Sequence, residues 1–159
     1  RFRSRNIADP IDMGRADDHR AVRALGVLFG IAVEVVLADL AGLRVLQGRY
    51  DEARDLGREA ILLCREMGDR RGIAWALESL AVTHAAQNQA ERAGRLWGAS
   101  EGLLESVGSS VPPTYKWIRD RYFDGVRESL GERAFEAVLS EGRAMSIQQA
   151  VQYALADES

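Results

Sequence analysis

The stretch VLADLAGLRVLQGRYDEARDLGREAILLCREM, from Val36 to Met67, sets a pattern that returns 40 residues later in ALESLAVTHAAQNQAERAGRLWGASEGLLESV, from Ala76 to Val107. Small, apolar and turn residues keep the same register in both copies. The matched pairs include Leu37 and Leu77, Leu40 and Leu80, Ala41 and Ala81, Gly48 and Asn88, Ala53 and Ala93, Leu56 and Leu96, and Leu63 and Leu103. A register sustained at a fixed period indicates stacked supersecondary units.

Within each unit the apolar residues recur at helical spacing, mostly three or four residues apart, which predicts an amphipathic helix. In the second helix of each unit these residues are Ala53, Leu56, Ala60, Leu63, Cys64 and Met67, and then Ala93, Leu96, Trp97, Ser100, Leu103, Leu104 and Val107. First helices are predicted over 33–47 and 73–87. Each ends at a short polar turn, where Gly48 and Asn88 tolerate the left-handed conformation that closes a helix.

The repeats divide the chain into four parts. Residues 1–29 are interpreted as an irregular start and the end of a partial preceding repeat, 30–69 and 70–108 as two repeats, and 109–159 as a linker and a three-helix C-terminal cap. Pro113 is expected to open the first cap helix, and Ser146 is the expected N-cap of the last. The cap would cover the apolar face that the last repeat otherwise exposes.

Small residues at three successive positions of each unit resemble the tetratricopeptide repeat. They are Ala41, Ala53 and Ala60 in the first unit and Ala81, Ala93 and Ser100 in the second. The resemblance implies an all-α fold, a right-handed superhelical array of antiparallel helix hairpins with C-terminal capping helices. Two features depart from the family: Arg44 and His84 replace its usual tyrosine, and the period is 40 rather than about 34 residues.

The longer repeat, together with the C-terminal runs 130–135 and 141–146, is similar to the helical arrays of bacterial STAND-class ATPases and large LuxR-type, MalT-like transcriptional regulators. This resemblance implies a cytoplasmic, effector-sensing or protein-binding module of such a regulator. A free-standing scaffold or dimerisation module without a regulatory parent is the alternative. The start at Arg1 rather than methionine fits a fragment of a larger protein, and the single lysine, Lys116, fits a high-GC bacterial genome.

In the tetratricopeptide family the first helices line a concave groove that accepts extended or helical segments. Carried over by position, the partner-binding residues of this face are Gly42, Leu46, Trp75, Glu78, Ser79 and Val82. Trp75 is the expected anchor, since tryptophan is enriched among binding hot spots. The expected partner is a protein, a peptide or another domain of the parent chain, and a homodimer is also open. Alternatively, neighbouring helices of the parent protein fill the groove.

The remaining chemistry points away from catalysis. A net charge of -3 gives no basic excess for nucleic acid, and the lone cysteine, Cys64, excludes an internal disulfide and a CxxC zinc site. We find no phosphate-binding loop, no activated nucleophile and no apolar run of membrane-spanning length. The sequence therefore predicts no enzyme, no metal, no cofactor and no membrane segment.

An aromatic cluster provides the strongest argument for nucleic-acid binding. Two arginines, Arg119 and Arg121, lie among aromatic side chains that could stack on bases; these are Tyr115, Trp117, Tyr122 and Phe123. The acidic balance of the chain favours the other interpretation, in which this cluster packs the core of the cap.

Overall fold

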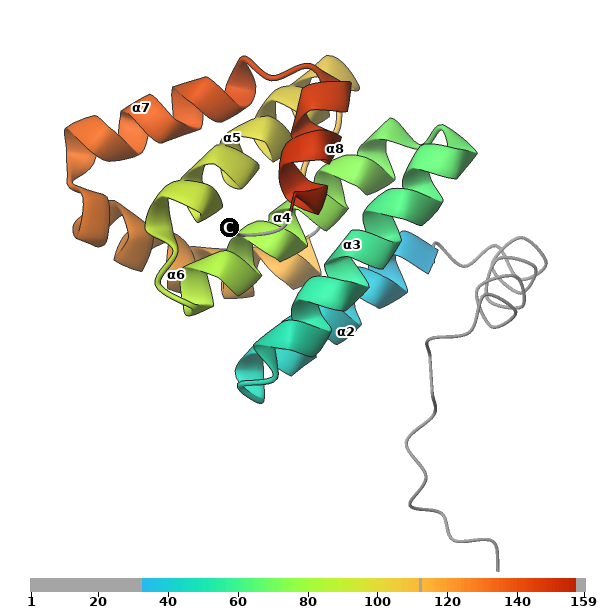
Figure 1. Cartoon of the computed structure of the whole chain (residues 1–159), viewed down its shortest axis with the longest axis horizontal. Coiled ribbons are helices and arrows are strands. Elements are labelled where there is room, and N and C mark those ends of the chain that lie inside the picture. Colours follow the sequence, from blue (N-terminus) through green and yellow to red (C-terminus); the bar gives the residue numbers. More distant parts are fainter. Residues whose placement is uncertain (1–32, 112, 157–159) are drawn as a thin grey trace, which may run out of the picture. The chain divides into compact units, whose positions relative to one another are not determined.

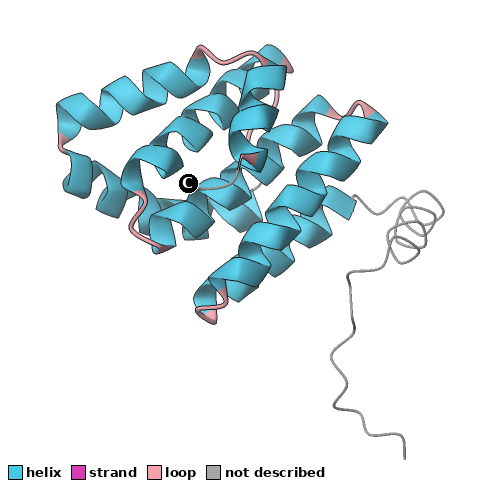
Figure 2. Ribbon diagram, viewed as in Figure 1, coloured by secondary structure: helices cyan, strands magenta, loops and turns pink. Residues whose placement is uncertain are grey.

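The computed structural model describes residues 33–111 and 113–156. Over these ranges it contains helices and turns and no strand (Figure 2). The helices are α2 (Val33–Leu46), α3 (Tyr50–Met67), α4 (Arg70–Ala86), α5 (Ala90–Ser106), α6 (Pro113–Leu130), α7 (Glu132–Arg143) and α8 (Ile147–Leu155) (Figure 1). From Glu34 on, these helices belong to one compact unit, 34–159. The features predicted for 1–29 lie outside the described residues.

The turns inside the two hairpins, α2–α3 and α4–α5, repeat with the predicted period. Gly48 and Asn88 both adopt positive φ, 72° and 61°. The amide of Arg49 donates to the carbonyl of Arg44 at 2.8 Å, and 40 residues later the amide of Gln89 donates to that of His84 at 2.9 Å. The left-handed closing residues predicted at 48 and 88 are confirmed.

The turns that follow α3 and α5 repeat as well. Gly68 and Gly108 have φ of 68° and 63°. The amide of Asp69 donates to the carbonyl of Cys64 at 2.8 Å, and its equivalent, Ser109, donates to Leu104 at 3.0 Å. Asp69 also caps α4 by accepting from the Gly72 amide at 3.0 Å. Similar local hydrogen bonds therefore end the second helix of each hairpin.

The small residues that define the repeat are all in the core, as predicted. Ala41, Ala53, Ala81, Ala93 and Ser100 have 0 % of their surface exposed, and Ala60 has 1 %. They leave space for the neighbouring helix to approach closely. At Gly57 of α3 the approach is closer still, since a Cβ there would lie 2.7 Å from Cδ2 of Leu80 in α4.

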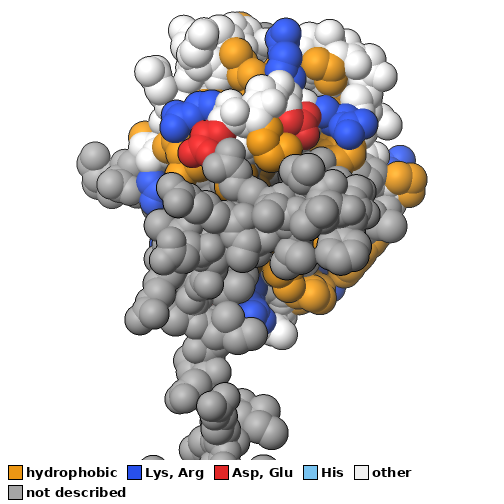
Figure 3. Space-filling model, turned by 90° about the vertical axis from the view of Figure 1, so that its right-hand side faces the viewer, with side chains coloured by type: hydrophobic (Ala, Val, Ile, Leu, Met, Phe, Trp, Pro, Cys, Tyr) orange, Lys and Arg blue, Asp and Glu red, His pale blue; other side chains and the backbone are white. Residues whose placement is uncertain are grey.

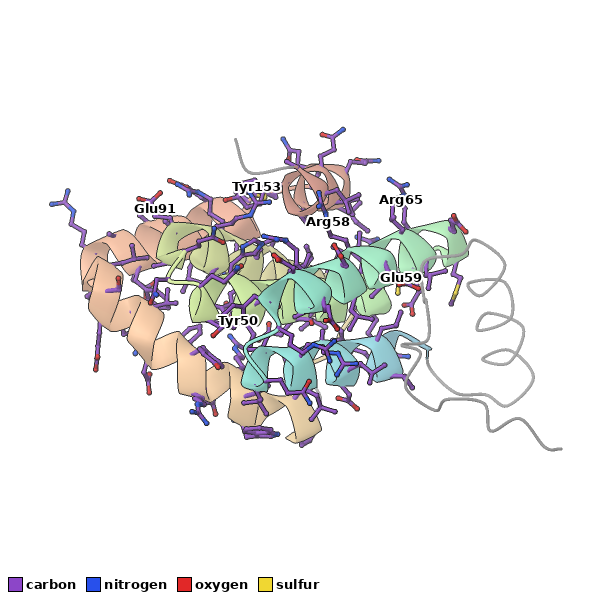
Figure 4. All side chains as sticks on the ribbon, turned by 60° about the horizontal axis from the view of Figure 1, so that its bottom comes forward. Tyr50, Arg58, Glu59, Arg65, Glu91 and Tyr153 are labelled. Atoms are coloured by element: carbon purple, nitrogen blue, oxygen red, sulfur yellow. The ribbon has the colours of Figure 1, made fainter. Side chains whose placement is uncertain are left out.

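The three C-terminal helices do not form one layer. Figures 1 and 4 show α6 and α8 on opposite sides of the layer formed by α3, α4 and α5, while α7 runs along α5. Ser146 caps α8 as predicted: its hydroxyl accepts from the Gln149 amide, and the Gln149 side chain accepts from the Ser146 amide. The predicted capping helices are thus present, but they cover two different faces of the repeats.

Two arginines hold the C-terminal end of α8. Arg92 of α5 donates to the carbonyls of Tyr153 and Ala156, each at 3.0 Å, and Arg58 of α3 donates to that of Leu155. Figure 4 shows Arg58 and Tyr153 where α8 crosses these helices. Cations are favourable at this end because the last carbonyls of a helix are unpaired and carry a partial negative charge.

Substituting Arg92→Ala is expected to loosen α8. The variant loses both hydrogen bonds to the α8 carbonyls and the contact of the guanidinium with the Tyr153 ring, 5.0 Å from its centroid. Hydrogen bonds from a charged group contribute about 1.5–3 kcal/mol, so urea denaturation should show a loss of that order. Hydrogen exchange should accelerate in α8 before α4. Arg121→Ala, at an exposed position of α6, is the matched control. Equal exchange of α8 in both variants would contradict this account.

Candidate functional site

Helix α6 covers the face of α2 and α4 that the sequence assigns to partner binding. Gly42 of α2 lies beneath it: a Cβ at this position would lie 3.4 Å from Cδ1 of Ile118 and 3.6 Å from Cε2 of Tyr115. Both of these α6 side chains are buried. Ile118 and Tyr115 of α6 therefore lie at van der Waals distance from α2 at Gly42.

The predicted site residues are distributed between the interior and the surface. Glu78, Val82, Ser79 and Gly42 are buried, because α6 and the neighbouring hairpin helices enclose them. Leu46 is the exposed member, with 42 % of its surface accessible. The alternative of a groove filled by helices describes the structure, although the helix α6 comes from this chain. The role of the six predicted site residues in binding a partner stays a prediction.

Trp75, the expected anchor, is half-buried at the edge of this face. Its indole Nε1 donates to the carbonyl of Ser110 at 3.2 Å, so the linker before α6 passes over it. The guanidinium of Arg71 lies 4.9 Å from the centroid of its ring. Trp75 thus joins α4 to the start of the segment that covers the groove.

A chain of alternating charges lies beneath α6. Glu78 of α4 is fully buried, and its carboxylate lies 3.1 Å from Nε of Arg119 in α6. Arg119 also pairs with Glu101 of α5, and Glu101 accepts from Arg143 of α7 at 2.6 Å. These four side chains connect four helices, and Arg119 lies between the two carboxylates. A buried carboxylate needs such a partner, because it has lost its hydration.

Burial raises the pKa of Glu78 to about 7, and the negative charge of Glu101 adds to the rise. The positive charge of Arg119 opposes it. The carboxyl of Glu78 consequently exchanges its proton near neutral pH, where an ordinary glutamate is ionised. Burial also raises the pKa of the neighbouring Tyr115 hydroxyl.

The aromatic cluster of α6 extends this contact toward α5 and α7. The Phe123 ring lies 5.0 Å from that of Trp97 and 4.9 Å from that of Phe135 between ring centroids, and the Arg119 guanidinium lies 5.0 Å from it. The predicted packing role is confirmed for Phe123 and for the buried Tyr115. It is wrong for Trp117, which is 55 % exposed because it lies on the outer side of α6.

The pairing of Arg119 with Glu78 was not predicted from sequence. A signal was present, since Glu78 interrupts an otherwise small and apolar run in α4 with a charge that a core position does not tolerate alone. That signal predicts some cationic partner. It does not say which of the arginines supplies it, because the choice depends on the path of α6.

A second cleft, of about 270 Å³, lies between the α3–α4 turn and the start of α8. Ile73, Ile147 and Val151 give it apolar walls, and Arg65 and Arg70 contribute charge. Figure 3 views the molecule from the right-hand side of Figure 1, where the α3–α4 turn lies, and shows hydrophobic side chains between charged ones. No sequence pattern predicted this cleft, because its two sides are about 80 residues apart in the chain.

Two further side chains with chemically reactive groups, those of Cys64 and His84, lie in the interior. Both are buried, and Nδ1 of His84 contacts the Gln89 side chain. Among the described residues, no group of three or more His, Cys, Asp or Glu is arranged to hold a metal ion. Within the same part of the chain, no helix has the length and apolar character needed to cross a membrane.

The fold and the covered groove define an all-α protein built from repeated helical hairpins. The tetratricopeptide repeat family model matches residues 33–96, which comprise α2, α3, α4 and the first part of α5. This region is therefore tetratricopeptide-like, and repeats of this family generally mediate protein–protein interaction. No curated protein and no solved structure matched the chain.

Proposed function

We propose that this chain is a protein-interaction module that binds a protein or peptide on the face formed by α2 and α4. The observation that carries the proposal is the occupancy of this face by α6. A helix already fits there, with Tyr115 and Ile118 in contact with α2 at Gly42 and Arg119 beside Glu78. Gly42, Glu78, Ser79 and Val82 would form the floor of the site, and Leu46 and Trp75 its accessible edge.

We also propose that the chain is part of a larger parent protein. The module would sense an effector for a bacterial, cytoplasmic signal-transduction or transcriptional regulator of the LuxR or STAND ATPase type, without catalytic activity of its own. The 40-residue period and the C-terminal runs 130–135 and 141–146 support this, since they resemble the arrays of those regulators. The partner would then be an effector or another domain of the same regulator.

Site-specific photo-crosslinking tests the location of binding. A benzophenone amino acid placed at Leu46 or Trp75 should crosslink one discrete partner in cells. The same probe at Arg133, an exposed position of α7, is the control and should not. Absence of a crosslink from both positions, or an equal yield from position 133, would place the interaction elsewhere.

The second candidate is a free-standing scaffold or dimerisation module. It is favoured by an apolar stripe on α2, where Val36, Leu43 and Leu46 are 45 %, 52 % and 42 % exposed. Exposed apolar stripes of this kind mark surfaces for association. Light scattering over a range of concentrations separates the candidates: a mass that stays at one chain throughout would rule out the dimer.

A further inference from the structure

Helix α6 is connected to its neighbours differently from α7. Left-handed glycines, Gly108 with φ 63° and Gly131 with φ 77°, stand in the turns before and after it. Helix α7 is held firmly, because the backbones of α5 and α7 touch at Gly98 and Gly142. Gly131 thus lies between α7, which packs tightly on α5, and α6, whose neighbouring helices approach it less closely.

Some buried polar atoms between α6 and the groove lack a hydrogen-bond partner among the described residues. The hydroxyls of Tyr115 and Ser79 are both buried, and within the described residues neither has a hydrogen-bonding partner of good geometry. The Glu78 carboxylate is paired with Arg119 by charge, without a well-aligned hydrogen bond to it. Buried polar atoms in this condition cost free energy, so they weaken the attachment of α6.

The charges left in the groove specify what would replace α6. Without Arg119, two carboxylates, Glu78 and Glu101, face the site. Arg143 is the cation that contacts Glu101 from α7. An incoming helix that brings a cation restores the charge pairs that Arg119 makes with Glu78 and Glu101.

We propose that α6 is an internal substitute for a basic amphipathic helix of a partner, which enters the groove between α2, α4 and α5 and displaces α6. The incoming helix presents an arginine to Glu78 and Glu101 and an aromatic or aliphatic side chain to Gly42. This inference rests on the proposed function, since both place the partner on the α2–α4 face. It adds the chemistry of the partner and the helix that must move.

A labelled peptide of residues 113–130 is the probe, because it carries the same Arg119, Tyr115 and Ile118. Ile118→Ala in the full chain weakens α6, so the groove is open in a larger fraction of molecules and the peptide should bind about tenfold tighter or more than to wild type. A peptide with Arg119→Glu should bind to neither. Arg121→Ala in the full chain is the matched control and should behave as wild type.

Hydrogen exchange of the wild-type chain gives a measurement that does not depend on the stability of a variant. Saturating peptide should raise the exchange rate of α6 amides and leave α4 and α5 protected. Equal binding of the Arg119→Glu peptide, or unchanged α6 protection at saturation, would overturn the inference. If Leu46 and Trp75 still crosslink a partner in that case, the proposed function stands without it. A wild-type dimer that exchanges α6 between copies would assign the groove to a second copy instead.

Discussion

Gly98→Ala is expected to separate α5 from α7 and to destabilise the protein strongly. A Cβ at this position would overlap the Leu139 carbonyl group, lying 2.9 Å from its carbon, and would lie 3.1 Å from the Arg143 amide nitrogen. These are backbone atoms, so no side chain can rotate away. Overpacking of this kind costs about 3 kcal/mol, and urea denaturation should show a loss of that size. Gly142→Ala should act similarly, since its Cβ would lie 2.8 Å from the Ala99 amide nitrogen.

Gly125→Ala is the control for this prediction. Gly125 is an exposed position inside α6, and no atom lies within 4 Å of the place its Cβ would take. Alanine there removes the entropic disadvantage of glycine in a helix and should stabilise the protein by about 0.5–1 kcal/mol. If Gly98→Ala and Gly125→Ala have the same effect, α5 and α7 do not pack through their backbones.

The stability of the protein is expected to fall as the pH rises through the range set by Glu78. Burial raises the pKa of this carboxyl from 4.5 to about 7 in the folded state. Between these values the folded chain holds a proton that the unfolded chain has released, so the free energy of unfolding decreases with pH. Below pH 4.5 the free-energy cost of ionising the buried Glu78 is absent, and above about pH 7 that cost is complete. At 1.36 kcal/mol per pH unit the total is roughly 3 kcal/mol.

Glu78→Gln should remove this dependence, because an amide does not titrate. Denaturant unfolding of both proteins between pH 4.5 and pH 8.5 measures the difference. The variant should gain relative to wild type as the pH rises, by roughly 3 kcal/mol over the range. Glu105→Gln, at an exposed position near the end of α5, is the matched loss of one carboxylate and should give the wild-type profile. Parallel curves for wild type and Glu78→Gln would contradict the prediction.

Features of the fold with a local cause were predictable from sequence. The left-handed turns at Gly48 and Asn88 and the cap at Ser146 depend on residues within a few positions along the chain. The burial of Ala41 and Ala81 followed from the repeat itself, because a small residue kept at a fixed period indicates close packing.

The candidate site was predictable only in part. The positions of its floor residues were predicted from the repeat. Their burial was not predicted, because it depends on α6, which is distant from them in the sequence. Glycines at 94, 98 and 102 in α5 recur at four-residue spacing and indicate a close helix contact. The sequence does not say that Gly142 of α7 meets them, because a small face accepts any helix of matching shape.

The sequence by itself determined the helices, their turns and the 40-residue stacking of the hairpins, because periodicity and backbone preference act over short distances. Only the tertiary structure decided that α6 lies over α2 and α4, that Arg119 pairs with Glu78, and that α7 touches α5 through its backbone. An apolar stripe such as that of α6 can be buried against several surfaces. The buried carboxylate of Glu78 selects one of them by pairing with Arg119, and it is in place only after the hairpins have packed.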